Sequence, residues 1–235
     1  MARKKTENEH VSDVQDKVLT AALPLIPFDG WSDSTIAAAV GDAGVDPDLA
    51  RLAFPRGGVD LALAFHRRGD QALRDAVAAR DLSGLRYSER VAELIWLRLD
   101  AISDQREAVR RAAALFALPH HAADGAGAIW STADAIWTCL GDTSRDLNWY
   151  TKRMTLSAVY SSVLLYWLGD QSEGFSDTRA FIDRRIENVM SFEKTKARFR
   201  ESPLGKAFEA GPLRLLQGIR APEPRDDLPG RMYRG

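Results

Sequence analysis

Hydrophobic positions recur every three or four residues along most of this chain, which is the spacing of one helix face. The pattern is regular at Ile129, Ala133, Ile136 and Leu140. Between residues 147 and 168 apolar side chains occupy nearly every face, which predicts a central, buried helix. Few runs alternate as strands do, so the sequence predicts an all-α protein.

The N-terminal part predicts short helices over 13–26, 34–40 and 49–54, with a longer helix after Gly57-Gly58. This spacing resembles the helix-turn-helix module of TetR-type repressors. Between residues 31 and 60, however, five acidic residues outnumber two arginines. Because affinity for phosphates comes largely from cations, we expect no nucleic-acid partner. A TetR-class transcriptional regulator with an apolar effector pocket is the alternative.

Composition adds few constraints. The 235 residues are 45% hydrophobic and carry a net charge near −1, so any electrostatic partner must meet a local patch. A single cysteine, Cys139, fits a reducing compartment. No apolar signal segment opens the chain, and the longest uncharged run, 154–169, is shorter than a bilayer span. These features predict a soluble, cytoplasmic, bacterial protein.

Sequence motifs for catalysis and metal binding are missing. The chain lacks a Gly-rich phosphate loop, a nucleophile elbow and a reactive-cysteine signature. The adjacent His120 and His121 project in different directions and have no helical i, i+4 ligand partner. We therefore expect no enzyme, no metal and no cofactor.

The stretch 141–153 has the most unusual composition. On a helix Asp146, Trp149, Tyr150 and Arg153 share one face. Tryptophan, tyrosine and arginine are the types that anchor interfaces. Spacing alone leaves open whether this face docks a partner or packs inward. Thr143 and Asp146 have capping-box spacing, which predicts that Thr143 opens the helix.

The C-terminal part changes character after residue 194. Seven cations and two acids accompany a helical apolar stripe between residues 194 and 220. The membrane-contacting residues predicted on it are Leu204, Phe208, Leu215, Leu216 and Ile219. This basic amphipathic helix either lies on a membrane surface or docks on the protein's own core. Gly211-Pro212 should kink it.

Several motifs together resemble the coenzyme Q biosynthesis protein nine family, over about residues 18–189. The central one is the string from Gly141 to Arg153, which contains Asp-Leu-Asn-Trp-Tyr-Thr-Lys-Arg. Supporting motifs are Leu118-Pro119-His120, Ile136-Trp137, Tyr160, Phe175-Ser176-Asp177-Thr178, Phe181 and Arg184-Arg185-Ile186.

The resemblance implies a TetR-like helical bundle that forms a homodimer and binds isoprenoid quinone precursors or phospholipid. It also implies a partner, the demethoxyubiquinone hydroxylase or an equivalent enzyme. The family's partner-binding patch corresponds to Leu118, Pro119, His120, Asp146, Trp149, Tyr150 and Arg153. We assign to its lipid cavity the residues Trp137, Met154, Ala158, Leu165 and Phe181.

These inferences predict five regions along the chain. They are a disordered N-terminus (1–12), a helix-turn-helix-like module (13–75), a lipid-binding domain (76–200), a membrane-contacting helix (201–220) and a disordered tail (221–235). The predicted function is a non-enzymatic lipid-binding accessory protein of ubiquinone biosynthesis. It would be cytoplasmic and peripheral on the inner face of the bacterial plasma membrane.

Overall fold

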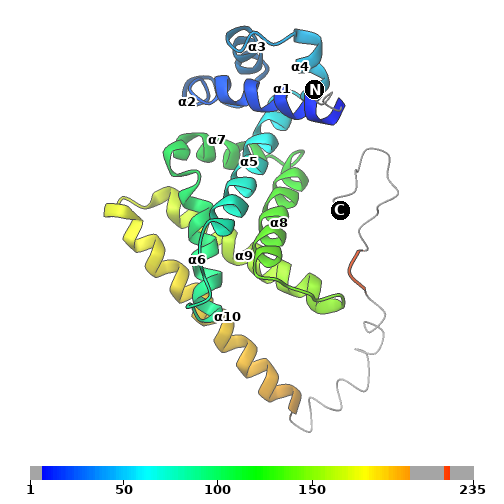
Figure 1. Ribbon diagram of the computed structural model, residues 1–235. Helices are drawn as coiled ribbons and strands as arrows, with labels where there is room; N and C mark the ends of the chain where they lie inside the picture. The colour runs from blue at the N-terminus through cyan, green and yellow to red at the C-terminus, as the bar shows by residue number, and fades with distance from the viewer. Residues whose placement is uncertain (1–6, 202–219, 223–235) are drawn as a thin grey trace. The chain divides into compact units, whose positions relative to one another are not determined.

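The computed structural model describes residues 7–201 and 220–222, and within these ranges it contains helices and no strand (Figure 1). This confirms the predicted all-α class. The elements are α1 (Glu7–Ala22), α2 (Ile26–Asp29), α3 (Asp33–Asp42), α4 (Pro47–Ala53), α5 (Gly58–Ala78), α6 (Tyr87–Asp100), η1 (Ser103–Gln105), α7 (Arg106–Phe116), α8 (Ala122–Cys139), α9 (Leu147–Gly169), η2 (Glu173–Phe175) and α10 (Ser176–Glu201).

The described chain forms two compact units. The first contains residues up to 72 together with 101–128, and the second contains 73–100 and the described residues from 129 onward. The sequence predicted a boundary near residue 75 and placed 101–128 in the second region. The contacts of α7 explain this difference: Arg111 donates to the carbonyl of Pro27, and α7 packs on α2.

In the first unit α1 packs against α3 and α4, and the buried Trp31 connects this module to the rest of the unit. The Trp31 ring lies 5.3 Å from that of Phe65, and its indole donates to the carbonyl of Ala108. Helix α5 begins at Gly58, next to the main chain of Trp31. A Cβ on Gly58 would lie 2.1 Å from the Trp31 carbonyl oxygen, so this close approach requires glycine.

The second unit is organised by α9, whose middle is buried. Tyr160, Val163 and Trp167 are at most 1% exposed. Helix α10 packs on both α6 and α9 and brings the buried Ile182 into the same core. This arrangement supports the predicted central position of the most apolar helix only in part, because Met154 and Leu165 on α9 are 60% and 66% exposed.

The turn between α8 and α9 differs from the predicted capping box. Gly141 adopts φ +75°, and the amide of Asp142 donates to the carbonyl of Trp137, as expected for a glycine that ends a helix. Asp146, and not Thr143, is the N-cap residue of α9: its carboxylate accepts from the amide of Asn148. The prediction that Thr143 opens the helix is therefore wrong. In the structure Asp142 stabilises the turn by accepting a hydrogen bond from the Ser144 hydroxyl.

No helix in the described ranges is both long and apolar enough to cross a bilayer. The predicted membrane-contacting residues Leu204, Phe208, Leu215, Leu216 and Ile219 lie outside the described residues.

Candidate functional site

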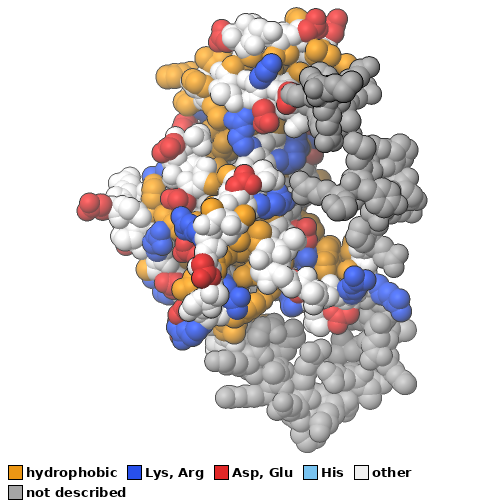
Figure 2. Space-filling model, viewed as in Figure 1, with side chains coloured by type: hydrophobic (Ala, Val, Ile, Leu, Met, Phe, Trp, Pro, Cys, Tyr) orange, Lys and Arg blue, Asp and Glu red, His pale blue; other side chains and the backbone are white. Residues whose placement is uncertain are grey.

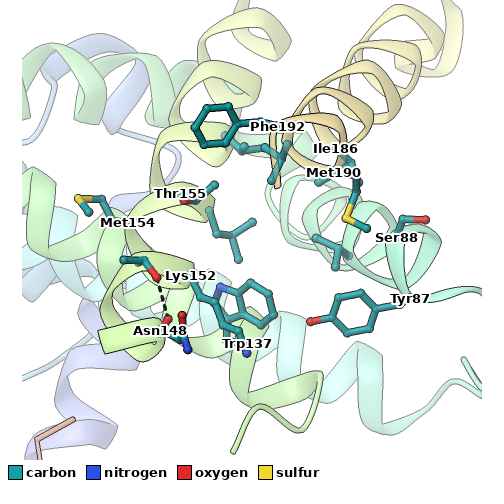
Figure 3. A pocket seen from close by; sticks show the side chains of 15 residues that line it. Tyr87, Ser88, Trp137, Asn148, Lys152, Met154, Thr155, Ile186, Met190 and Phe192 are labelled. Carbon is teal, nitrogen blue, oxygen red and sulfur yellow. Dashed lines mark hydrogen bonds between the residues drawn. The ribbon is translucent and has the colours of Figure 1, made fainter. Parts of the chain in front are cut away.

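A largely apolar cavity of about 410 Å³ lies in the second unit (Figure 3). Helices α6, α8, α9 and α10 each contribute to its wall. Its buried apolar lining consists of Val91, Leu156, Val159 and Ile186. This volume falls within the range of roughly 300–1,000 Å³ typical of small-molecule sites. A purely structural module without a cavity is therefore disfavoured.

Large apolar side chains around the cavity are exposed to solvent. Met154 is 60% exposed and Phe192 is 67% exposed, and both belong to the lining. Met190 of α10 is a second methionine in the lining. Methionine adapts its shape to irregular ligands, so this lining suits a flexible apolar molecule.

One wall of the cavity is polar. Tyr87, Asn148 and Lys152 lie near Trp137, whose ring centroid is 5.2 Å from the Lys152 ammonium. Burial raises the pKa of Tyr87, so its phenol remains a hydrogen-bond donor at neutral pH. The indole N–H of Trp137 is buried and has no hydrogen-bond partner among the described residues.

A buried ionic network fixes the start of α9 next to this wall. Lys152 and Arg153 bind the two carboxylate oxygens of Asp142 at 2.7 and 3.1 Å, and Arg153 also binds Asp134 at 2.6 Å. Burial alone would raise the pKa of Asp142. The hydrogen bonds from Lys152, Ser144 and Arg153 outweigh burial and lower this pKa to about 2. The carboxylate is therefore charged at neutral pH and holds both cations.

Three aromatic rings beside this network form what we call the aromatic surface: Trp130, Trp149 and Tyr150. The centroids of Trp149 and Tyr150 are 4.8 Å apart in an edge-to-face arrangement, and Trp130 lies 5.8 Å from Trp149. All three side chains are half-buried. The guanidinium of Arg153 stacks on the Trp149 ring at 4.0 Å, which fixes the orientation of this indole.

Comparison with known proteins agrees with these features. The COQ9 family model matches residues 122–193, which contain α8, α9 and most of α10. The human protein "Ubiquinone biosynthesis protein COQ9, mitochondrial" is 28% identical over 228 residues, which cover 86% of this chain and 65% of that protein. The Xenopus laevis protein "Ubiquinone biosynthesis protein COQ9-B, mitochondrial" is 30% identical over 194 residues, or 78% of this chain and 64% of that protein.

The chain is therefore similar to COQ9 proteins over most of its length. It spans slightly less than two thirds of the length of these curated relatives. A TetR transcriptional regulator from Nitrosomonas europaea has a similar structure, with a TM-score of 0.59 and 22% identity over 74% of this chain and 97% of the regulator. This likeness confirms the TetR-like fold of the chain.

The residues predicted for the partner-binding patch fall in both units. Leu118, Pro119 and His120 are exposed in the first unit, between α7 and α8. The other four are in the second unit. There Asp146 is exposed as the N-cap of α9, and Trp149 and Tyr150 form the aromatic surface.

Arg153, the fourth of these residues, is placed differently from its neighbours. Its side chain is only 4% exposed and is committed to Asp134 and Asp142. It also stacks beneath Trp149. The contacts of Arg153 are therefore those of a residue that positions the aromatic surface.

Of the predicted lipid-binding residues, Trp137 and Met154 line the cavity. Ala158 and Leu165 are exposed on α9 and Phe181 stacks on Tyr166 at 4.3 Å, and none of these three is in the lining. The sequence did not single out Val91, Val159 or Ile186 as lining residues. Each carries only the signal of an ordinary core position, since helix packing decides which buried residues border a space.

The ion pairs of Arg51 and Arg56 also bear on the regulator alternative. Arg51 pairs with Asp48 at 2.6 Å, and Arg56 pairs with Asp60 and Asp124 at 2.8 and 2.9 Å. Both arginines counted in this segment therefore already have carboxylate partners. On the face shown in Figure 2, acidic and basic side chains are interspersed. These features disfavour a phosphate-binding surface on this module.

Proposed function

We propose that this chain is a member of the COQ9 family and a non-enzymatic lipid-binding accessory protein of ubiquinone biosynthesis. In this proposal, the cavity holds an isoprenoid quinone precursor or a phospholipid. The observation that carries the proposal is the largely apolar cavity between α6, α8, α9 and α10. The names of the relatives, which are ubiquinone biosynthesis proteins, support the pathway.

The chemistry of the cavity suits an amphipathic ligand. Burying one five-carbon isoprene unit against its apolar wall contributes roughly 4 kcal/mol, at about 0.8 kcal/mol per carbon. The polar wall offers the Tyr87 hydroxyl as a donor to a ring or headgroup oxygen. A quinone precursor, with an oxygenated ring and an apolar tail, has both features.

The ionisable groups among the described lining residues support a binding role. They are Tyr87 and Lys152. The Tyr87 phenol stays protonated, because burial raises its pKa. The Lys152 ammonium already donates to Asp142 and Ser144, so it is not presented as a base to a ligand. We therefore assign binding and presentation of the lipid to this chain, and its chemical conversion to a partner.

The proposed partner is the demethoxyubiquinone hydroxylase or an equivalent enzyme. The aromatic surface supports this, because half-buried tryptophan and tyrosine are typical anchors of protein interfaces. Homodimerisation and contact of residues 204–219 with the inner face of the plasma membrane are further parts of the proposal. The alternative of a TetR-class regulator predicts a specific, salt-sensitive gel shift with DNA.

A complementation experiment tests the proposal. Cells that lack this chain should lose ubiquinone and accumulate a hydroxylase substrate, and the wild-type gene should restore both. Thr155→Trp should not restore them, because Thr155 is an exposed residue of the lining and the larger ring would fill the cavity. Ala158→Trp is the matched control on the same helix, since Ala158 is exposed but outside the lining. Unchanged quinone content in the cells without the gene would refute the proposal.

A further inference from the structure

A segment far along the chain contacts the aromatic surface. Residues 220–222, Arg-Ala-Pro, have no regular secondary structure and lie beside the turn that precedes α9 (Figure 1). The amide of Ala221 donates to the carbonyl of Arg145 at 2.9 Å. The Tyr150 hydroxyl donates to the carbonyl of Arg220 at 3.3 Å. Two main-chain groups of the segment are therefore held at the site where the aromatic surface begins.

The sequence of this segment favours an extended conformation. Pro222 fixes its own φ, and its ring disfavours the helical region for the preceding Ala221. An extended conformation at Ala221 is therefore favoured before any contact forms, so less conformational entropy is lost on binding. Pro222 itself is exposed, so its role here is to favour the extended conformation of the segment.

We propose that the aromatic surface is a receptor for extended, proline-containing peptide and that Arg220-Ala221-Pro222 is its resident intramolecular ligand. The segment occupies the surface in the free protein through the Ala221 amide and the Arg220 carbonyl. A partner that docks through Tyr150 must displace the segment, for example with an extended proline-containing segment of its own. This consequence for the hydroxylase rests on the proposed function, whereas occupancy by the segment does not.

The test removes one donor without altering the aromatic surface. Ala221→Pro deletes the amide hydrogen that binds the Arg145 carbonyl, and Ala221→Ser keeps it. The Arg145 carbonyl belongs to the same peptide group as the Asp146 amide. The 15N–1H signal of Asp146 in the full chain therefore reports this hydrogen bond. We expect the Asp146 signal to shift in Ala221→Pro and to keep its wild-type position in Ala221→Ser.

A peptide of residues 217–226 then tests the receptor in trans. At an effective concentration of about 1 mM for an intramolecular ligand, a segment that occupies the surface most of the time must bind in trans with a Kd below about 1 mM. The peptide should move the Asp146 signal of Ala221→Pro back toward its wild-type position, and the same peptide carrying proline at 221 should not. If partner docking competes, Ala221→Pro should bind the hydroxylase about fivefold tighter, the equivalent of one hydrogen bond.

The proposal is overturned if the Asp146 signal is the same in Ala221→Pro and the wild type. It is also overturned if the peptide leaves that signal unmoved in the variant. Neither measurement requires lipid or hydroxylase, so failure here leaves the proposed function standing. Conversely, a protein without lipid could still show the intramolecular contact.

Discussion

Replacing Arg153 should destabilise the fold, although its sequence position suggests a docking residue. The guanidinium is 4% exposed and binds Asp134 at 2.6 Å and Asp142 at 3.1 Å. Arg153→Met keeps an apolar stem against Trp149 but removes the charge from Asp142, whose side chain is 3% exposed. Breaking a buried ion pair costs about 3–5 kcal/mol. Because Lys152 still binds Asp142, we expect the lower value, about 3 kcal/mol.

Urea unfolding measures this change as a shift in midpoint at constant slope. The control is Arg145→Met, which removes an exposed arginine from the same stretch and should change stability by less than about 0.5 kcal/mol. The double variant Asp142→Asn with Arg153→Met should lose less than the sum of the single changes, since the two residues are in contact. An Arg153→Met protein within about 1 kcal/mol of wild type that fails to dock its partner would refute this assignment and favour direct contact.

Three further predictions concern the pH dependence of stability, partner docking and membrane contact. Hydrogen bonds outweigh the effect of burial and lower the pKa values of Asp142 and Asp170 from 3.8 to about 2. The stabilisation of the fold by these two carboxylates should therefore be present above pH 4 and be lost as the pH drops toward 2. Urea unfolding measured against pH should show a loss of about 2 kcal/mol for each group. Trp149→Ala and Tyr150→Ala should each leave the circular dichroism spectrum unchanged and weaken hydroxylase binding by more than about 1 kcal/mol, and an unfolded variant would show that the residue supports the core. Phe208→Asp should reduce flotation with anionic liposomes, whereas unchanged flotation would favour docking on the protein's own core.

Helical periodicity was sufficient to predict the class of the fold and a buried face on α9, but not that Met154 and Leu165 are exposed on the same helix. Val159, Val163 and Trp167 are buried on that helix, as its apolar pattern indicates. The turn before α9 was less predictable. Thr143 has the spacing of a capping residue, but a buried carboxylate nearby, Asp142, organises the turn instead. Asp142 takes this role through its contact with Arg153, which is a tertiary contact that the local sequence does not encode.

The candidate site was predictable in part for a similar reason. Trp149 and Tyr150 form an aromatic surface, as residue type and spacing suggested. Arg153 has the same helical spacing, yet carboxylates from the end of α8 and the following turn draw it inward. The cavity lining could not be listed from sequence, because Val91 and Ile186 come from helices far apart in the chain. The contact of Ala221 with Arg145 likewise has no local sequence signal.

Mass spectrometry of lipid carried by the purified protein tests the central claim most directly. The full chain is purified without detergent, and native spectra of wild type, Thr155→Trp and Ala158→Trp are compared before the bound lipid is extracted and identified. We predict that wild type and Ala158→Trp carry lipid enriched in quinone precursors, and that Thr155→Trp is empty because its ring fills the cavity. A wild-type protein that is consistently empty, or a Thr155→Trp variant that carries the same lipid, would contradict the claim.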